Sequence, residues 1–172
     1  SEADQKSGVP FVVLDRITGA VLDKRALDPG NILLGRETSR LYLSFFRRRA
    51  AIMQYDLRTR SILAEEPAPQ KADRMLVLDD QDEVLLASPV NGEIYRFDTS
   101  TLAAKGSIKA IFGARVMAVD RKLGVLLCGS LVTGEVAFIR LIDHEVVGRI
   151  YLGPWLRTIQ IDETRGVAFV SS

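Results

Sequence analysis

The apolar stretch Val84–Ser88 (VLLAS) recurs with little change at Val125–Gly129 (VLLCG) and at Val167–Ser171 (VAFVS). The three copies begin 41 and 42 residues apart, and a weaker copy, Leu41–Phe45 (LYLSF), begins 43 residues before the first. Self-similarity at a fixed period of this length indicates a repeat architecture. Because each copy is short and apolar and is followed by turn residues, it predicts one buried β-strand in every repeat.

Aspartates mark the ends of two further sets of strands. The strands that precede the three clear copies end at Asp79, Asp120 and Asp162. Another set ends at Asp15, Asp56 and Asp98, each followed three residues later by a threonine, at Thr18, Thr59 and Thr101. Both side chains can bond nearby backbone amides, so this spacing predicts a tight turn. The fourth unit departs from the pattern, because Leu141 replaces the aspartate and residues 142–144 make the turn.

Four short strands in a unit of about 42 residues are typical of a β-propeller blade. We label the strands of a blade a to d, from the centre outward. The predicted strands are 11–15 and 20–25; 31–34, 41–46, 51–56 and 61–65; 74–79, 83–88, 93–98 and 103–108; 115–120, 124–129, 135–141 and 145–151; and 156–162 and 167–171. The turn pairs Asn91-Gly92, Thr133-Gly134 and Thr18-Gly19 suit hairpins. The predicted fold class is all-β, a β-propeller of four-stranded antiparallel blades.

Two alternatives accompany this fold prediction. The first unit supplies only strands c and d and the last only a and b, so one composite blade could close a ring of four. We favour part of a larger propeller, whose other blades lie outside this stretch or come from another copy. A helix over residues 48–66 is the competing secondary structure, because Ile52, Tyr55, Ile62 and Leu63 lie loosely at helical spacing.

Composition narrows the possible functions. The chain has 172 residues, with 23 Lys and Arg against 22 Asp and Glu, which argues against a nucleic-acid arm or a polybasic membrane patch. No apolar run reaches the roughly 18 residues of a membrane-spanning helix. We expect residues 1–8 to be a polar segment or linker and residues 9–172 to form the blades. A single cysteine, Cys128, and a single histidine, His144, leave no cysteine zinc site or multi-histidine metal centre. We read His144 as a turn residue and Cys128 as a buried apolar side chain.

The stretch Val147–Asp162 resembles the YVTN-type β-propeller repeat. In that family strand d ends in glycine, a proline-containing connection follows, and strand a ends in aspartate; Gly153, Pro154 and Asp162 stand at these places. Phe169–Ser172 occupies the position of the tyrosine-valine-threonine-asparagine motif without matching it, and residues 66–73 replace the Gly-Pro connection in an earlier unit. The resemblance implies about seven blades and a protein that is often bacterial and periplasmic or surface-exposed. It implies no single activity.

Partner-binding residues are expected where the b–c turns and the d–a connections share one face. Arg and Trp are enriched at interface hot spots, and the predicted site consists of Arg47, Arg48, Arg49, Asn91 and Trp155. The alternative is that the arginines form a solvated turn and that Trp155 packs against a neighbouring blade. The opposite face collects aspartates, but no Asp-x-Asp-x-Asp-Gly calcium loop is present. We therefore expect no metal site and no cofactor.

Two classes of function remain open. The first is a non-catalytic module that binds a protein partner or further propeller blades, as a homo- or hetero-oligomer. The second is a propeller enzyme of the lactonase or sugar-oxidising kind, which needs acidic, histidine or metal-binding residues at the central channel. We favour the first class, because the predicted inner strands are almost purely aliphatic.

Overall fold

Every regular element longer than three residues in the described chain is a β-strand. The computed structural model describes residues 10–35, 39–45, 49–72 and 74–172. Within them the only helical element is a 3-10 turn at Asp79–Gln81. The described residues contain no helix that is long and apolar enough to cross a bilayer. The helix considered for residues 48–66 is wrong, because β5 (Ala51–Asp56), a turn and β6 (Ser61–Pro67) occupy residues 51–66.

In the described part of the chain, sixteen strands form three four-stranded and two two-stranded antiparallel sheets. Blade 1 contains β1 (Phe11–Leu14) and β2 (Val21–Arg25). Blade 2 contains β3 (Asn31–Leu34), β4 (Arg40–Phe45), β5 (Ala51–Asp56) and β6 (Ser61–Pro67). Blade 3 contains β7 (Arg74–Leu78), β8 (Glu83–Ala87), β9 (Glu93–Asp98) and β10 (Ala104–Lys109). Blade 4 contains β11 (Ala114–Asp120), β12 (Val125–Ser130), β13 (Glu135–Arg140) and β14 (Val146–Tyr151), and blade 5 contains β15 (Thr158–Asp162) and β16 (Val167–Ser171).

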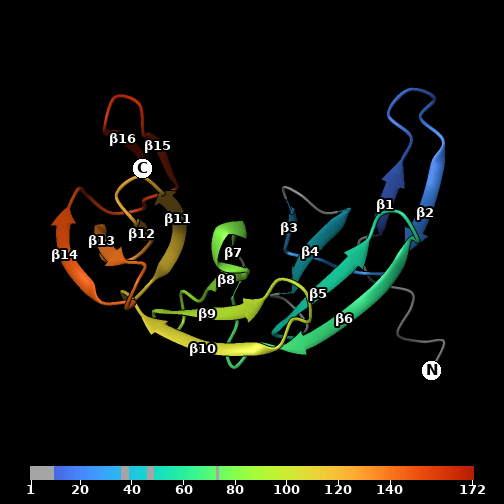
Figure 1. The fold of residues 1–172 in the computed structure, drawn as a ribbon, viewed down its shortest axis with the longest axis horizontal. Helices are drawn as coiled ribbons and strands as arrows, with labels where there is room; N and C mark the ends of the chain where they lie inside the picture. Colours follow the sequence, from blue (N-terminus) through green and yellow to red (C-terminus); the bar gives the residue numbers. More distant parts are fainter. Residues whose placement is uncertain (1–9, 36–38, 46–48, 73) are drawn as a thin grey trace.

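The sheets follow one another around an arc (Figure 1). Their a strands lie side by side, β3 beside β7, β7 beside β11 and β11 beside β15. This arrangement of antiparallel blades is the β-propeller that the repeat predicts. The end sheets β1–β2 and β15–β16 do not pair with each other, so no composite blade closes a ring of four within one copy.

Hydrophobic packing occurs between blades. Phe97 of β9 belongs to the cluster shared with blade 2, whereas Ile94, which lies on the opposite face of the same strand, belongs to the cluster shared with blade 4. All five residues of β8 are buried, as expected for a strand covered on both faces, and five of the six residues of the outer strand β10 are exposed. Each complete blade therefore contributes one face to each of two cores.

The aspartate turns form as predicted. The Oδ1 atoms of Asp15, Asp56 and Asp98 accept from the backbone N–H groups three residues later, at 2.7, 3.0 and 2.9 Å. These hydrogen bonds lower the pKa of the Asp15 and Asp56 carboxyls, and the pKa of Asp98 is lowered first by a hydrogen bond from the Ser100 hydroxyl and then by the backbone bonds. The aspartates thus remain ionised and hold the c–d turns at neutral pH.

Candidate functional site

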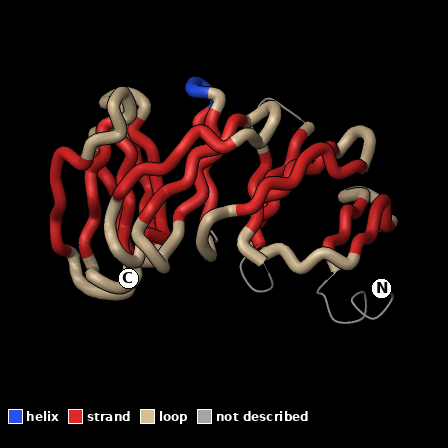
Figure 2. The backbone as a smooth tube through the Cα atoms, turned by 90° about the horizontal axis from the view of Figure 1, so that it is seen from below, coloured by secondary structure: helices blue, strands red, loops and turns tan. Residues whose placement is uncertain are grey.

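The b–c turns and the d–a connections meet on one face, which we call the loop face. The Gly92 carbonyl of one b–c turn accepts from Ala110 N at 3.0 Å and from Ile111 N at 3.2 Å. Blade 4 repeats the contact, with Leu152 N donating to the Gly134 carbonyl at 2.9 Å. The a–b and c–d turns gather on the opposite side, which we call the turn face and which includes the 3-10 turn in Figure 2.

Glycines bring the b–c turns against these connections. Gly92 has φ +72°, and a Cβ built on it would lie 2.7 Å from the backbone of Ile111 and Phe112. A Cβ on Gly134, at φ +74°, would lie 2.4 Å from the Gly153 carbonyl oxygen. Only glycine permits both this backbone conformation and this close approach. The sequence identified both turns correctly but carried no signal of what lies against them.

Asn91 is held in place by its own turn. Its Nδ2 donates to Glu93 Oε2 at 3.0 Å and to the Tyr95 hydroxyl at 2.8 Å, and its Oδ1 accepts from Glu93 N at 3.2 Å. The amide is therefore oriented by β9 rather than left mobile on the surface. Its first role is to shape the turn, and it presents a rigid polar edge to the groove beside it.

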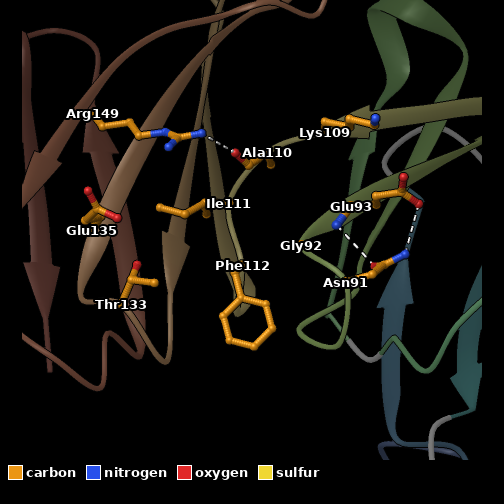
Figure 3. Close-up of a pocket in the computed structure, with 10 residues that line it drawn as sticks. All are labelled: Asn91, Gly92, Glu93, Lys109, Ala110, Ile111, Phe112, Thr133, Glu135 and Arg149. Carbon is orange, nitrogen blue, oxygen red and sulfur yellow. Dashed lines mark hydrogen bonds between the residues drawn. The ribbon is translucent and has the colours of Figure 1, made fainter.

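A shallow groove of about 320 Å³ opens between blades 3 and 4 on the loop face. Figure 3 shows Asn91, Glu93 and Lys109 on the blade 3 side, Thr133, Glu135 and Arg149 on the blade 4 side, and the Phe112 ring between them. Arg149 Nη2 donates to the Ala110 carbonyl at 3.1 Å, which ties its guanidinium to the connection between the blades. Thr133 Oγ1 is buried and has no hydrogen-bond partner among the described residues.

Trp155 is exposed and lies in a conformation that bulky residues rarely adopt. Its φ is +68°, and 60% of its surface is accessible. The preceding unit has Gly113, at φ +78°, 42 residues earlier at the same point of its d–a connection. A left-handed non-glycine residue costs on the order of 1–3 kcal/mol. The chain thus places its only tryptophan where glycine would be less strained.

Arg49, the described member of the arginine run, lies elsewhere on the loop face. Arg49 Nη1 pairs with Glu65 Oε1 at 2.6 Å, and its guanidinium lies 4.9 Å from the centre of the Phe45 ring. Arg47 and Arg48 fall outside the described residues. Of the predicted site residues, Arg49 precedes β5 of blade 2 whereas Trp155 follows β14 of blade 4, so these two lie two blades apart along the arc. Turns of one face are separated by the angle between their blades.

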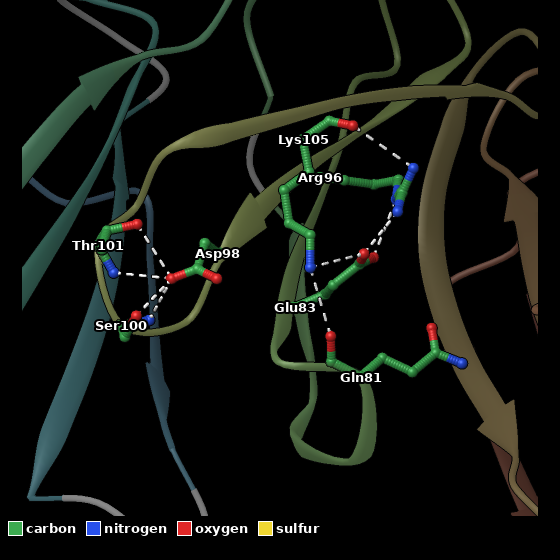
Figure 4. A network of polar contacts seen from close by, with 7 residues as sticks. All are labelled: Gln81, Glu83, Arg96, Asp98, Ser100, Thr101 and Lys105. Carbon is green, nitrogen blue, oxygen red and sulfur yellow. Dashed lines mark hydrogen bonds and ion pairs between the residues drawn. The ribbon is translucent and has the colours of Figure 1, made fainter.

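An ion-pair network on the side of blade 3 escaped the sequence reasoning. Buried Glu83 accepts from Arg96 Nε at 2.9 Å and pairs with Arg96 Nη2 at 2.5 Å and Lys105 Nζ at 3.2 Å (Figure 4). Burial alone would raise the pKa of Glu83, but the bonds from Arg96 and Lys105 outweigh it and leave this pKa lowered. The register of β8 and β9 could have indicated this network. Leu85 pairs with Arg96, and Glu83 lies two residues before Leu85 on the same face of β8, within reach of the arginine side chain.

Comparisons with known proteins identify the fold. Neither a search of family models nor a search of curated proteins gives a match. A chain of a solved mitotic checkpoint complex aligns with a TM-score of 0.70 and 11% identity, over 87% of this chain and 47% of its own. A chain of Kuenenia stuttgartiensis hydrazine synthase aligns with a TM-score of 0.75 and 16% identity, over 88% and 46%. The fold is that of a propeller. This chain spans about half the length of both matched chains, and the likeness extends to fold alone.

The described residues offer little for nucleophilic or metal chemistry. Burial raises the pKa of the Cys128 thiol to about 12, so the thiolate is scarce at neutral pH. His144 lies in the c–d turn of blade 4 and is half-buried. Among the residues that the structure describes, no three His, Cys, Asp or Glu side chains gather as a metal site.

Proposed function

We propose that this chain is a non-catalytic propeller module that binds another protein through its loop face, with Trp155 as the anchor. The observation that carries the proposal is the exposed tryptophan at φ +68°, where the preceding unit uses glycine. A strained residue persists where the surrounding structure or a function requires it, and tryptophan is the residue most enriched at interface hot spots. The ring supplies a large contact area at low cost in conformational entropy.

The module would form part of a larger propeller or assembly. Support comes from the unpaired end sheets β1–β2 and β15–β16, and from the matched chains, which are about twice as long as this one. We propose membership of the YVTN-type propellers and a periplasmic or extracellular location on the sequence resemblance alone. Knowledge of the flanking sequence tests both proposals, since further repeats would give the number of blades and a signal peptide would give the compartment.

The test of the binding proposal is Trp155→Gly. Because glycine accepts a positive φ, the variant should be as thermally stable as the wild type or more stable, by about 1 kcal/mol. Loss of a hot-spot ring should weaken binding of the partner by about 2 kcal/mol or more. Immobilised wild type and variant are compared for the proteins they retain from the source lysate, each identified by mass spectrometry and then purified for titration.

A matched control is Ile142→Ser, which removes an apolar side chain that is 87% exposed on the turn face. This control should retain the same proteins as the wild type. The proposal fails if every purified protein binds Trp155→Gly as tightly as it binds the control. It also fails if Trp155→Gly lowers the melting temperature while affinity is unchanged, because the ring would then serve internal packing.

A further inference from the structure

Large apolar side chains recur along the loop face of blades 3 and 4. Val90 and Val132 occupy the same position in consecutive b–c turns, 42 residues apart, and Phe112 and Trp155 lie in consecutive d–a connections. Their exposed fractions are 48%, 55%, 56% and 60% respectively. A run of exposed large apolar residues marks an interaction site more often than scattered single ones do.

Hydrogen bonds join these turns and connections into one continuous ridge. The Phe112 carbonyl accepts from Ser130 Oγ at 2.8 Å, and the Gly113 carbonyl accepts from Leu131 N at 2.9 Å. The Leu131 carbonyl in turn accepts from Trp155 N at 3.3 Å. Ala110 N and Ile111 N also donate to the Gly92 carbonyl. The ridge therefore runs from the b–c turn of blade 3 to the connection after blade 4. Its apolar side chains are thus presented by a fixed backbone, which reduces the entropic cost of binding.

The charge around the ridge is cationic. Beside blades 3 and 4, the described turns and connections of the loop face contain Lys71 and Arg157 and no acidic residue. The groove beneath adds Lys109 and Arg149, opposed by Glu93 and Glu135. Glu93 already accepts a hydrogen bond from Asn91 at 3.0 Å, and Arg149 is oriented by the Ala110 carbonyl.

We infer that the ridge of blades 3 and 4 binds an extended acidic peptide that carries large apolar side chains. This inference rests on the proposed function and names the chemistry of its partner. Apolar side chains of the peptide cover Val90, Phe112, Val132 and Trp155, and its carboxylates face Lys109, Arg149 and Arg157. An arginine held by a backbone carbonyl keeps further N–H donors for a carboxylate.

The test uses a short fluorescein-labelled peptide of alternating Glu and Phe or Leu, titrated by fluorescence anisotropy. Two comparison peptides replace Glu by Lys, or Phe and Leu by Ser. The acidic apolar peptide should bind at least about tenfold more tightly than either, and its binding should weaken as salt rises from about 0.05 M to about 0.3 M. Lys109→Glu and Phe112→Ser should each weaken binding by about tenfold. Lys122→Glu, an exposed lysine on the turn face, should not.

Two results overturn the inference. One is equal or tighter binding of the Lys peptide, and the other is equal weakening by Lys122→Glu and Lys109→Glu. Suppose that no acidic peptide binds, but a purified protein binds Ile142→Ser normally and Trp155→Gly more weakly. The proposed function then stands and this inference fails. If both experiments are negative, both proposals fail.

Discussion

Left-handed residues recur at fixed places in the repeat. In the c–d turns the position is occupied by Gly19, Arg60, Leu102 and His144, which are 41 or 42 residues apart and have φ between +55° and +72°. In the a–b turns it is occupied by Asp82, Gly124 and Gly166, with φ of +51°, +65° and +65°. The backbone of each turn is therefore the same whether or not the residue is glycine. Strain is concentrated in the units where glycine is absent.

The a–b turns offer a reciprocal test of that strain. Asp82→Gly should raise the free energy of unfolding by up to about 1 kcal/mol, and Gly124→Ala should lower it by about 1 kcal/mol or more. Space does not limit the second change, because a Cβ on Gly124 meets no atom within 4 Å. Urea unfolding monitored by circular dichroism gives both values. Changes of the same sign in both variants would contradict a conformational origin.

Residue identities predicted the turns well and the neighbours of the candidate residues poorly. Asp98 and Thr101 bond locally, so their spacing was sufficient to predict the turn. Asn91 was predicted to lie on the loop face, but its bonds to Glu93 and Tyr95 depend on the side from which β9 leaves the turn. The strain at Trp155 could have been inferred by aligning the units, because Gly113 stands at its position. The sequence gives no angle between blades, which is why it could group Arg49 and Trp155 on one face but not show that they lie two blades apart.

Strands were predictable to within two residues at almost every end, because inner strands are covered on both faces and turns carry Asp, Thr and Gly. β9, for example, was predicted at its observed bounds, Glu93–Asp98. The helical alternative failed because almost every residue of β5 is buried, on both faces of the strand. This burial outweighs the local helical spacing of Ile52 and Tyr55. Tertiary burial between blades 1 and 3 decided the conformation of β5.

The surroundings of His144, in the c–d turn of blade 4, predict that the stability of the protein depends on pH. Burial lowers the pKa of His144 below its usual value of 6.5, and the charge of Arg96 lowers it further, whereas Glu83 and Asp143 act in the opposite direction. Below about pH 6.5 the unfolded chain therefore takes up this proton more readily than the folded protein does. The free energy of unfolding should decrease as the pH falls from 7 towards 5.

Melting temperatures across that range test this prediction, with His144→Asn as the matched variant. Asparagine tolerates the left-handed backbone of the turn and does not titrate. The decrease between pH 7 and 5 should be smaller in the variant. Both proteins should lose further stability below about pH 4.5. The pKa of Glu83 is lowered in the folded protein, so the unfolded chain takes up this proton first as the pH falls. Identical profiles for the two proteins between pH 7 and 5 would exclude a role for His144.

At the scale of the whole molecule, two strand edges of complementary type, in β1 and β16, have no pairing strand among the described residues. β16 is a b strand without its c strand, and β1 is a c strand without its b strand. In blade 3 the corresponding strands pair Val84 with Phe97. The repeat places Val167 at the position of Val84 and Leu14 at that of Phe97, so these two residues would lie opposite each other in a completed blade. Unpaired apolar edges recruit other strands.

We therefore expect the isolated chain to dimerise or aggregate through these edges. Phe169→Lys places a charge at a residue of β16 that is 61% exposed, and should shift the protein towards monomer in light scattering coupled to gel filtration. Ile142→Lys adds the same charge on the turn face and should leave the distribution unchanged. A wild-type chain that stays monomeric and resistant to protease at high concentration would contradict the expectation.

Because the hydrophobic clusters lie between blades, every interface is made by one face of each neighbour. Such an architecture lengthens or shortens by whole units, since removing about 42 residues from one turn to its equivalent rejoins two faces that already suit a neighbour. A deletion of half that length would remove two strands from a blade and leave part of each neighbouring face uncovered. Gene duplication in this lineage would therefore be tolerated in steps of one blade, and the Asp-ended turns mark where each step can begin.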